Sequence, residues 1–88
     1  MVKLIQKSYS NNLFDKRMTG MIDSFIFSID TLAQFEVEFK DRLSKVQGFG
    51  DKYKDVYYTN KLRDRLEIYR REPLKARDKV LYEVVLSK

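Results

Sequence analysis

The side chains of this chain that could do chemistry are basic residues and tyrosines between positions 52 and 79. That stretch holds ten Lys and Arg against five Asp and Glu, an excess equal to the net charge of +5 of the whole chain. Lys and Arg bind phosphates, while Tyr rings and Arg planes stack on unpaired bases. The pattern favours nucleic acid as the partner, RNA slightly before DNA. The candidate binding residues are Lys61, Arg63, Arg65, Tyr69, Arg70, Arg71, Lys75, Arg77 and Lys79.

The same residues also have a purely structural explanation. Charged side chains on an exposed strand keep a sheet edge soluble, and tyrosines of small sheets are often half-buried core. The secondary structure of positions 61–72 decides how the charges line up. As a helix capped by Asn60, the segment would bury Leu62, Leu66 and Tyr69 on one face. As a strand, which we favour for Leu66–Arg71, it presents an outward row interrupted by Glu67; the row is Lys61, Arg63, Arg65, Tyr69 and Arg71.

The composition argues against most kinds of active site. The chain has no His and no Cys. A zinc site, a histidine acid or base and a cysteine nucleophile are therefore excluded. The carboxylates of Asp23, Glu36 and Glu38 fit no catalytic motif and are most simply surface residues. We expect a non-catalytic protein with neither a metal nor a cofactor.

We expect one amphipathic helix to pack on the sheet that carries the basic stretch. Apolar residues recur between Thr31 and Gly48 at steps of three and four, which places them on one helical face; they are Leu32, Phe35, Phe39, Leu43 and Val46. Thr31 and Gln34 predict a capping box at the start, and Gly48 a helix end. Acid–base pairs four residues apart line the outer face, Glu36–Lys40, Glu38–Arg42 and Asp41–Lys45.

Short β-rich segments supply the surface on which this helix packs. We expect strands at 2–9, 21–29, 54–60, 66–71 and 80–86. Residues 13–19 are a loop or the outer end of the second strand, and residues 48–51 a glycine turn. The expected order is strand, strand, helix, then three strands. This order predicts one α+β domain over residues 1–88, with a mostly antiparallel sheet of four to five strands and a helix on one face.

The sequence also bears on the location of the protein and on partners other than nucleic acid. No apolar run reaches the roughly 20 residues that span a bilayer, and the first ten residues have no signal-peptide core. We expect a cytoplasmic protein without a membrane partner. Small basic chains of this kind also occur as phage or plasmid accessory proteins that block a host enzyme such as a nuclease, alone or together with RNA. The chain has twelve Phe and Tyr residues among its 88, and a homodimer in which some of them are buried is a further hypothesis.

In size, charge and late strands the chain is similar to small ribonuclease toxins of the RelE type. Proteins of that family are basic, contain an antiparallel sheet and cut RNA with Arg, Lys and Tyr side chains. The resemblance implies a third hypothesis for the function, a metal-independent ribonuclease. The sequence departs from the family because its two early helices are not expected here, and no motif matches.

Overall fold

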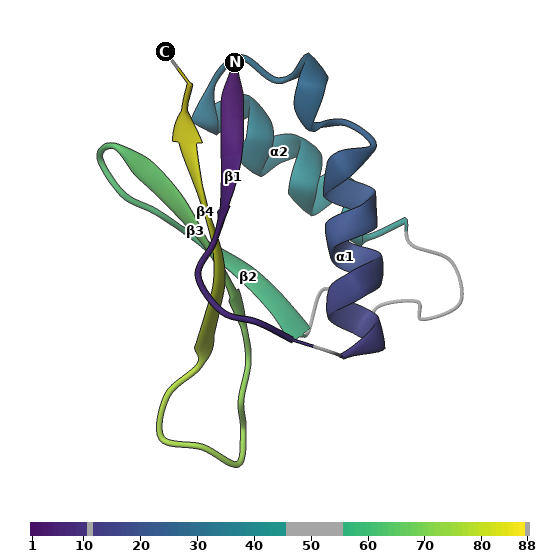
Figure 1. Cartoon of the computed structure of the whole chain (residues 1–88), viewed down its shortest axis with the longest axis vertical. Coiled ribbons are helices and arrows are strands. Elements are labelled where there is room, and N and C mark those ends of the chain that lie inside the picture. Colours follow the sequence, from purple (N-terminus) through teal and green to yellow (C-terminus); the bar gives the residue numbers. More distant parts are fainter. Residues whose placement is uncertain (11, 46–55, 88) are drawn as a thin grey trace.

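The computed structural model describes residues 1–10, 12–45 and 56–87. In chain order the elements are β1 (Val2–Gln6), α1 (Leu13–Asp23), the 3-10 turn η1 (Ile26–Ser28), α2 (Leu32–Leu43), β2 (Tyr57–Lys61), β3 (Arg65–Arg70) and β4 (Lys79–Leu86). The four strands form one antiparallel sheet in the order β1-β4-β3-β2. Both helices lie on the same side of this sheet (Figure 1). The expected α+β class with a helix-covered antiparallel sheet is confirmed.

The register determines which strand residues face the helices. Leu66 lies opposite Val84 and Lys61, and Val84 lies opposite Leu4. Leu66, Ile68 and Val84 are completely buried. Since side chains alternate along a strand, the intervening residues point to the other face of the sheet. That face carries no helix in the described part of the chain (Figure 1).

Helix α1 replaces the second strand that the sequence predicted. Asn12 caps it, because its Oδ1 accepts the Phe14 N–H at 2.7 Å. The predicted strand over residues 21–29 is wrong: the end of α1 and the η1 turn occupy it. Phe25 and Ile29 are buried while Phe27 is 71% exposed. This spacing of four belongs to a helical turn, whereas the alternation of apolar residues had indicated a strand.

Helix α2 follows the prediction closely. The Gln34 N–H donates to Thr31 Oγ1, and the Thr31 N–H donates to Gln34 Oε1, which completes the capping box. Arg42 pairs with Glu38 at 2.6 Å, and Lys45 with Asp41 at 3.1 Å. The carboxylate of Glu36 accepts a hydrogen bond from Thr59 of β2 at 3.0 Å and so ties the helix to the sheet. The helix ends at Leu43 with Ser44 as its C-terminal cap, so the expected end at Gly48 is wrong. Val46 and Gly48 themselves lie outside the described residues.

The core forms where α1 and α2 meet the sheet. Aromatic rings of the helical layer contact one another: Phe25 and Phe35 at a centroid distance of 5.5 Å, Phe35 and Phe39 at 5.8 Å. They close over the apolar face of the sheet, and the buried cluster is Val2, Met18, Ile22, Phe25, Ile29, Leu32, Phe35, Phe39, Leu43, Tyr57, Leu66, Ile68, Leu81 and Val84. Packing of this kind holds the strands at a fixed register, and with it the residues on the opposite face.

The later elements settle the remaining expectations. Residues 65–70 form β3, so the strand assignment for this segment is confirmed and the helical alternative is wrong. The strand expected over 54–60 is observed as β2, although residues 54 and 55 lie outside the described residues. The strands expected at the two ends of the chain are β1 and β4. The glycine turn at 48–51 also lies outside the described residues.

Candidate nucleic-acid interface

The helix-free side of the sheet, which we call the open face, carries Tyr58 and Tyr69. Cross-strand partners place together Tyr58 with Tyr69, Asn60 with Glu67, and Glu67 with Glu83. Arg65 lies opposite Val85, which in turn lies opposite Lys3. Partners that are directly opposite share a face, so these side chains all project away from the helices. The open face is therefore a mixture of aromatic, basic and acidic groups.

Two tyrosines of the open face form an aromatic stack. The rings of Tyr58 on β2 and Tyr69 on β3 are nearly parallel, with an interplanar angle of 8° and a centroid distance of 5.1 Å. The guanidinium carbon of Arg71 lies 4.7 Å from the centre of the Tyr58 ring. All three groups thus lie in one cluster on the open face. Such a cluster offers the kind of surface on which an unpaired base stacks.

Carboxylates orient the hydroxyls of both rings. The Tyr58 hydroxyl donates to Asp78 Oδ2 at 2.6 Å, and that of Tyr69 donates to Glu67 Oε1 at 3.0 Å. The bond to Asp78, with burial, raises the pKa of Tyr58 to about 12. Burial, together with the bond to Glu67, raises the pKa of Tyr69. Both rings stay neutral at physiological pH, and their positions are fixed by these bonds.

The centre of the open face is not strongly positive. Glu67 and Glu83 are directly opposite each other, an arrangement that costs stability unless cations lie nearby. The Nε of Arg65 lies 3.3 Å from Glu83, and the Lys7 amine 4.0 Å from the same carboxylate. The Asn60 amide donates to Glu67 at 3.2 Å. These contacts offset the acids, so uncompensated positive charge must lie at the ends of the strands.

The predicted basic residues lie in two separate places. Lys61, Arg63 and Arg65 surround the turn between β2 and β3, and we call them the turn cluster. Arg71, Lys75 and Arg77 lie in the loop between β3 and β4, and we call them the loop cluster. The two connections lie at opposite ends of the sheet (Figure 1). At a rise of about 3.3 Å per residue, the length of β3 separates them by about 17 Å.

The single outward row expected from the sequence is only partly formed. Arg65, Tyr69 and Arg71 lie on the open face. Lys61 is opposite the buried Leu66 and therefore belongs to the helix-covered side, although its side chain is exposed. Arg63 lies in the turn before β3, where strand alternation no longer applies. Regular alternation could not predict these two positions because β2 ends at Lys61 and β3 begins only at Arg65.

Arg70 is not a surface residue. Its side chain is 14% exposed and binds Asp15 of α1 through Nη1 and Glu72 through Nη2, the latter at 2.8 Å. Burial alone would lower the pKa of Arg70, but the bond to Glu72 and the charge of Asp15 outweigh burial and raise it. Lys79 is also engaged, because its amine donates to the Tyr9 carbonyl at 3.2 Å. The structure therefore separates both residues from the open face.

The partner of Arg70 was missed by sequence reasoning. Asp15 is 4% exposed and accepts bonds from both the Tyr57 hydroxyl and Arg70. It joins the first turn of α1 to β2 and β3. The signal that could have found it is the spacing of Asp15, Met18 and Ile22, which share one helical face once residues 13–23 are taken as a helix.

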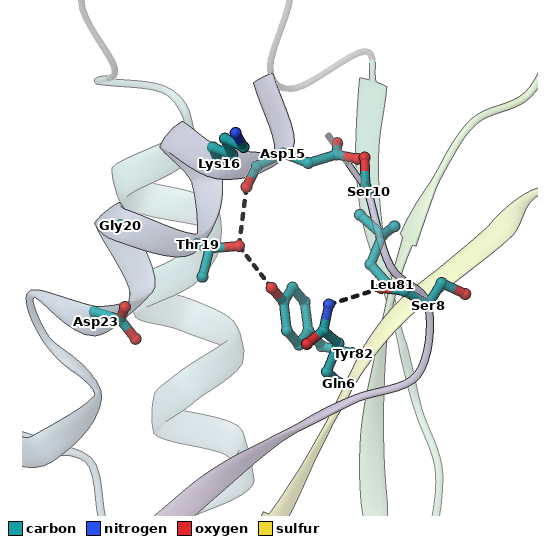
Figure 2. A pocket seen from close by; sticks show the side chains of 10 residues that line it. All are labelled: Gln6, Ser8, Ser10, Asp15, Lys16, Thr19, Gly20, Asp23, Leu81 and Tyr82. Atoms are coloured by element: carbon teal, nitrogen blue, oxygen red, sulfur yellow. Dashed lines mark hydrogen bonds between the residues drawn. The ribbon is translucent and has the colours of Figure 1, made fainter. Parts of the chain in front are cut away.

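A cleft of about 260 Å³ opens beside Asp15, between α1, β4 and the segment that follows β1. Figure 2 shows Thr19 at its centre, with the Thr19 hydroxyl 2.8 Å from that of Tyr82 and 2.9 Å from the Asp15 carbonyl. Lys16 and Asp23 lie at its helical side. The side chains of Ser8, Asp15, Thr19 and Tyr82 are engaged in hydrogen bonds within the protein.

Among the residues that the structure describes, no three carboxylates come close enough together to hold a metal ion. No helix within the described ranges has the length and apolar character needed to cross a bilayer. Comparison of the chain with protein-family models, with curated proteins and with solved structures gave no match.

Proposed function

We propose that this protein binds single-stranded nucleic acid, RNA in preference to DNA, on the open face of its sheet. It acts in this proposal as a binding protein without catalytic activity. The observation that carries the proposal is the Tyr58–Tyr69 stack with Arg71 over the Tyr58 ring. Stacking on an aromatic ring requires an unpaired base, which explains the choice of a single strand over a duplex.

The two basic clusters supply the electrostatic part of this proposal. A strand that follows β3 passes the turn cluster at one end, and the tyrosine stack and then the loop cluster at the other end. Its phosphates would meet Arg63 first, beside Arg65, which already pairs with Asp64 and Glu83, and would meet Lys75 and Arg77 last. The acidic centre formed by Glu67 and Glu83 then lies under bases rather than phosphates, which avoids repulsion. A footprint of a few nucleotides fits the length of about 17 Å.

Fluorescence anisotropy with labelled oligonucleotides of about ten residues tests this proposal, since binding folds of this size cover roughly 4–16 nucleotides. Single-stranded RNA, single-stranded DNA of the same sequence and an RNA duplex are titrated at low and moderate salt. We expect both single strands to bind more tightly than the duplex, and single-stranded RNA to bind most tightly. Absence of binding to every probe at low salt would contradict the proposal.

A matched pair of variants at Tyr69 tests the stack itself. Tyr69→Phe keeps the ring and loses only the hydroxyl bond to Glu67. Tyr69→Ala removes the ring and should weaken single-strand binding between about fivefold and a hundredfold, because one base–aromatic contact contributes about 1–3 kcal/mol. Equal affinities of the two variants would argue against stacking on Tyr69.

A second candidate function is metal-independent RNA cleavage, and one observation favours it. The element order β-α-α-β-β-β places two helices before the late strands, of which the sequence predicted only α2. The expected absence of such a pair was the main departure from ribonuclease toxins of the RelE type. The open face holds Arg and Tyr side chains together with Lys3 of β1, the kinds of groups with which that family cuts RNA. In this second proposal Tyr69 and Arg71 would contact the scissile phosphate, and Arg65 at the other end of β3 would contact another phosphate of the same strand.

The binding and cleavage proposals are separated by the fate of the RNA. Labelled single-stranded RNA is incubated with the protein in excess chelator and resolved on a denaturing gel. Intact RNA recovered from a bound complex supports the binding function. Discrete fragments that disappear in the variants Arg65→Gln and Arg71→Gln, and persist in Lys16→Gln on α1, support cleavage.

A further inference from the structure

Asp78 contacts both the tyrosine stack and the loop between β3 and β4, which carries the loop cluster. Its Oδ2 accepts the Tyr58 hydroxyl at 2.6 Å, and its Oδ1 accepts the Glu72 N–H at 2.9 Å. Glu72 and Asp78 lie near the two ends of the loop between β3 and β4. One carboxylate therefore closes this loop on itself and attaches it to the aromatic stack.

The base of the loop is anchored on its other side as well. The Glu72 carboxylate binds Arg70, which in turn binds the buried Asp15. Both acidic residues of the loop are thus occupied by contacts within the protein. The side chains of Lys75 and Arg77 remain exposed, and between Glu72 and Asp78 they are the only cations of the loop. The loop consequently presents positive charge from a fixed base.

We propose that Asp78 is a positioning residue for nucleic-acid binding, which holds the loop cations in register with the Tyr58–Tyr69 stack. The ligand class is a single strand whose base stacks on the tyrosines while an adjacent phosphate meets Lys75 and Arg77. This inference rests on the proposed function. The bonds from Tyr58 and from the Glu72 N–H lower the pKa of Asp78, so the carboxylate stays charged and keeps both contacts at neutral pH.

If Asp78 positions the loop, its removal should weaken the binding of nucleic acid, whereas the change in net charge alone predicts stronger binding. Removal of any acidic residue raises the net charge by one and should strengthen the binding of an anion. Asp78→Ala does so too, but it also releases the loop from the stack. The loop that carries Lys75 and Arg77 must then be ordered on binding, which costs conformational entropy. We expect the loss to exceed the gain, with affinity falling about tenfold, which corresponds to 1.4 kcal/mol.

The matched control is Asp64→Ala in the turn between β2 and β3. It changes the net charge equally, but the Asp64 carboxylate pairs with the neighbouring Arg65 and is highly exposed. Affinities for labelled single-stranded RNA are measured for the wild type, Asp78→Ala, Asp78→Asn and Asp64→Ala. Asn keeps an oxygen for the Glu72 N–H and an amide for the Tyr58 oxygen. We expect Asp64→Ala and Asp78→Asn to bind at least as tightly as the wild type.

Tyr58→Phe provides a test that does not depend on how Asp78→Ala folds. It retains the ring and loses only the hydroxyl bond to Asp78, so it should weaken binding by about threefold to tenfold and reduce the salt dependence. Thermal unfolding confirms that each variant is folded. If the wild type binds, Tyr58→Phe matches the wild type and a folded Asp78→Ala matches Asp64→Ala, the role of Asp78 is overturned. If the wild type itself does not bind, the proposed function fails instead.

Discussion

Arg70 at the end of β3 is paired with Asp15 in the first turn of α1, 55 residues earlier in the chain. Both side chains are largely buried, and the Tyr57 hydroxyl binds the same carboxylate. This contact connects the helical layer to the strand that carries the tyrosine stack. It also withdraws one of the nine candidate binding residues from the surface.

Breaking this pair from one side should strongly destabilise the fold. Arg70→Met leaves the Asp15 carboxylate buried without its cation, and such changes cost about 3–5 kcal/mol. Urea denaturation at neutral pH measures the difference. The double variant Asp15→Asn/Arg70→Met removes both charges and should recover most of the stability. A single variant within about 0.5 kcal/mol of the wild type would show that the pair contributes little.

Alkaline pH should destabilise the protein through Tyr58. Its pKa is raised from 10.0 to about 12 in the folded protein. The stabilisation is therefore fully present below pH 10 and is lost as the pH rises towards 12, because the unfolded state releases the proton first. We expect the free energy of unfolding to fall across this window and to fall less in Tyr58→Phe. Identical pH profiles for the two proteins would contradict the raised pKa.

The salt dependence of RNA binding should identify which cations meet phosphates. Lys75→Gln/Arg77→Gln removes two cations of the loop cluster, and each phosphate contact contributes about 0.7 to the logarithmic salt slope on a single strand. The slope should therefore decrease by roughly 1.4. Lys16→Gln/Lys40→Gln removes the same charge from the helical layer and should leave the slope nearly unchanged. An equal effect of the two pairs would indicate nonspecific attraction to the net charge.

Gly20→Ala should stabilise the protein. Gly20 lies inside α1, and a methyl group added there would meet no atom within 4 Å apart from the adjoining residues and backbone of its own helix. Alanine in a helix interior is favoured over glycine by about 0.5–1 kcal/mol. The expected rise in Tm is about 2–8 °C for a domain of this size. A lower Tm would mean that the cleft beside Gly20 is occupied or reshaped when the protein folds.

Sequence periodicity was sufficient for the first three turns of α2 and for β4, while it left residues 61–72 open between a helix and a strand. The apolar spacing from Leu32 to Leu43 and the pair Thr31 and Gln34 are local signals, and local signals largely specify a capped helix. The short β-branched run in β4 is equally local. Together these elements were enough to predict the α+β class, because an amphipathic helix beside several strands has few ways to bury its apolar face.

The same approach failed at residues 21–29, where the evidence was ambiguous. Phe25, Phe27 and Ile29 alternate with other residues in a run of β-favouring side chains, so the segment fits a strand as well as a helical turn. Tertiary packing determines the secondary structure of this segment. Phe25 contacts Phe35 of α2, and Ile29 joins the same core, while Phe27 is left in solvent. Short apolar runs acquire their structure from such tertiary contacts rather than from their own periodicity.

By itself the sequence determined that positive charge and tyrosines gather late in the chain, since composition does not depend on folding. Only the tertiary structure decided where they point. It stacked Tyr58 on Tyr69, turned Arg70 inward to Asp15, and separated the remaining cations between the two ends of β3. The reason is physical: the direction of a strand side chain depends on register and on the partners across the sheet, which lie far away in sequence.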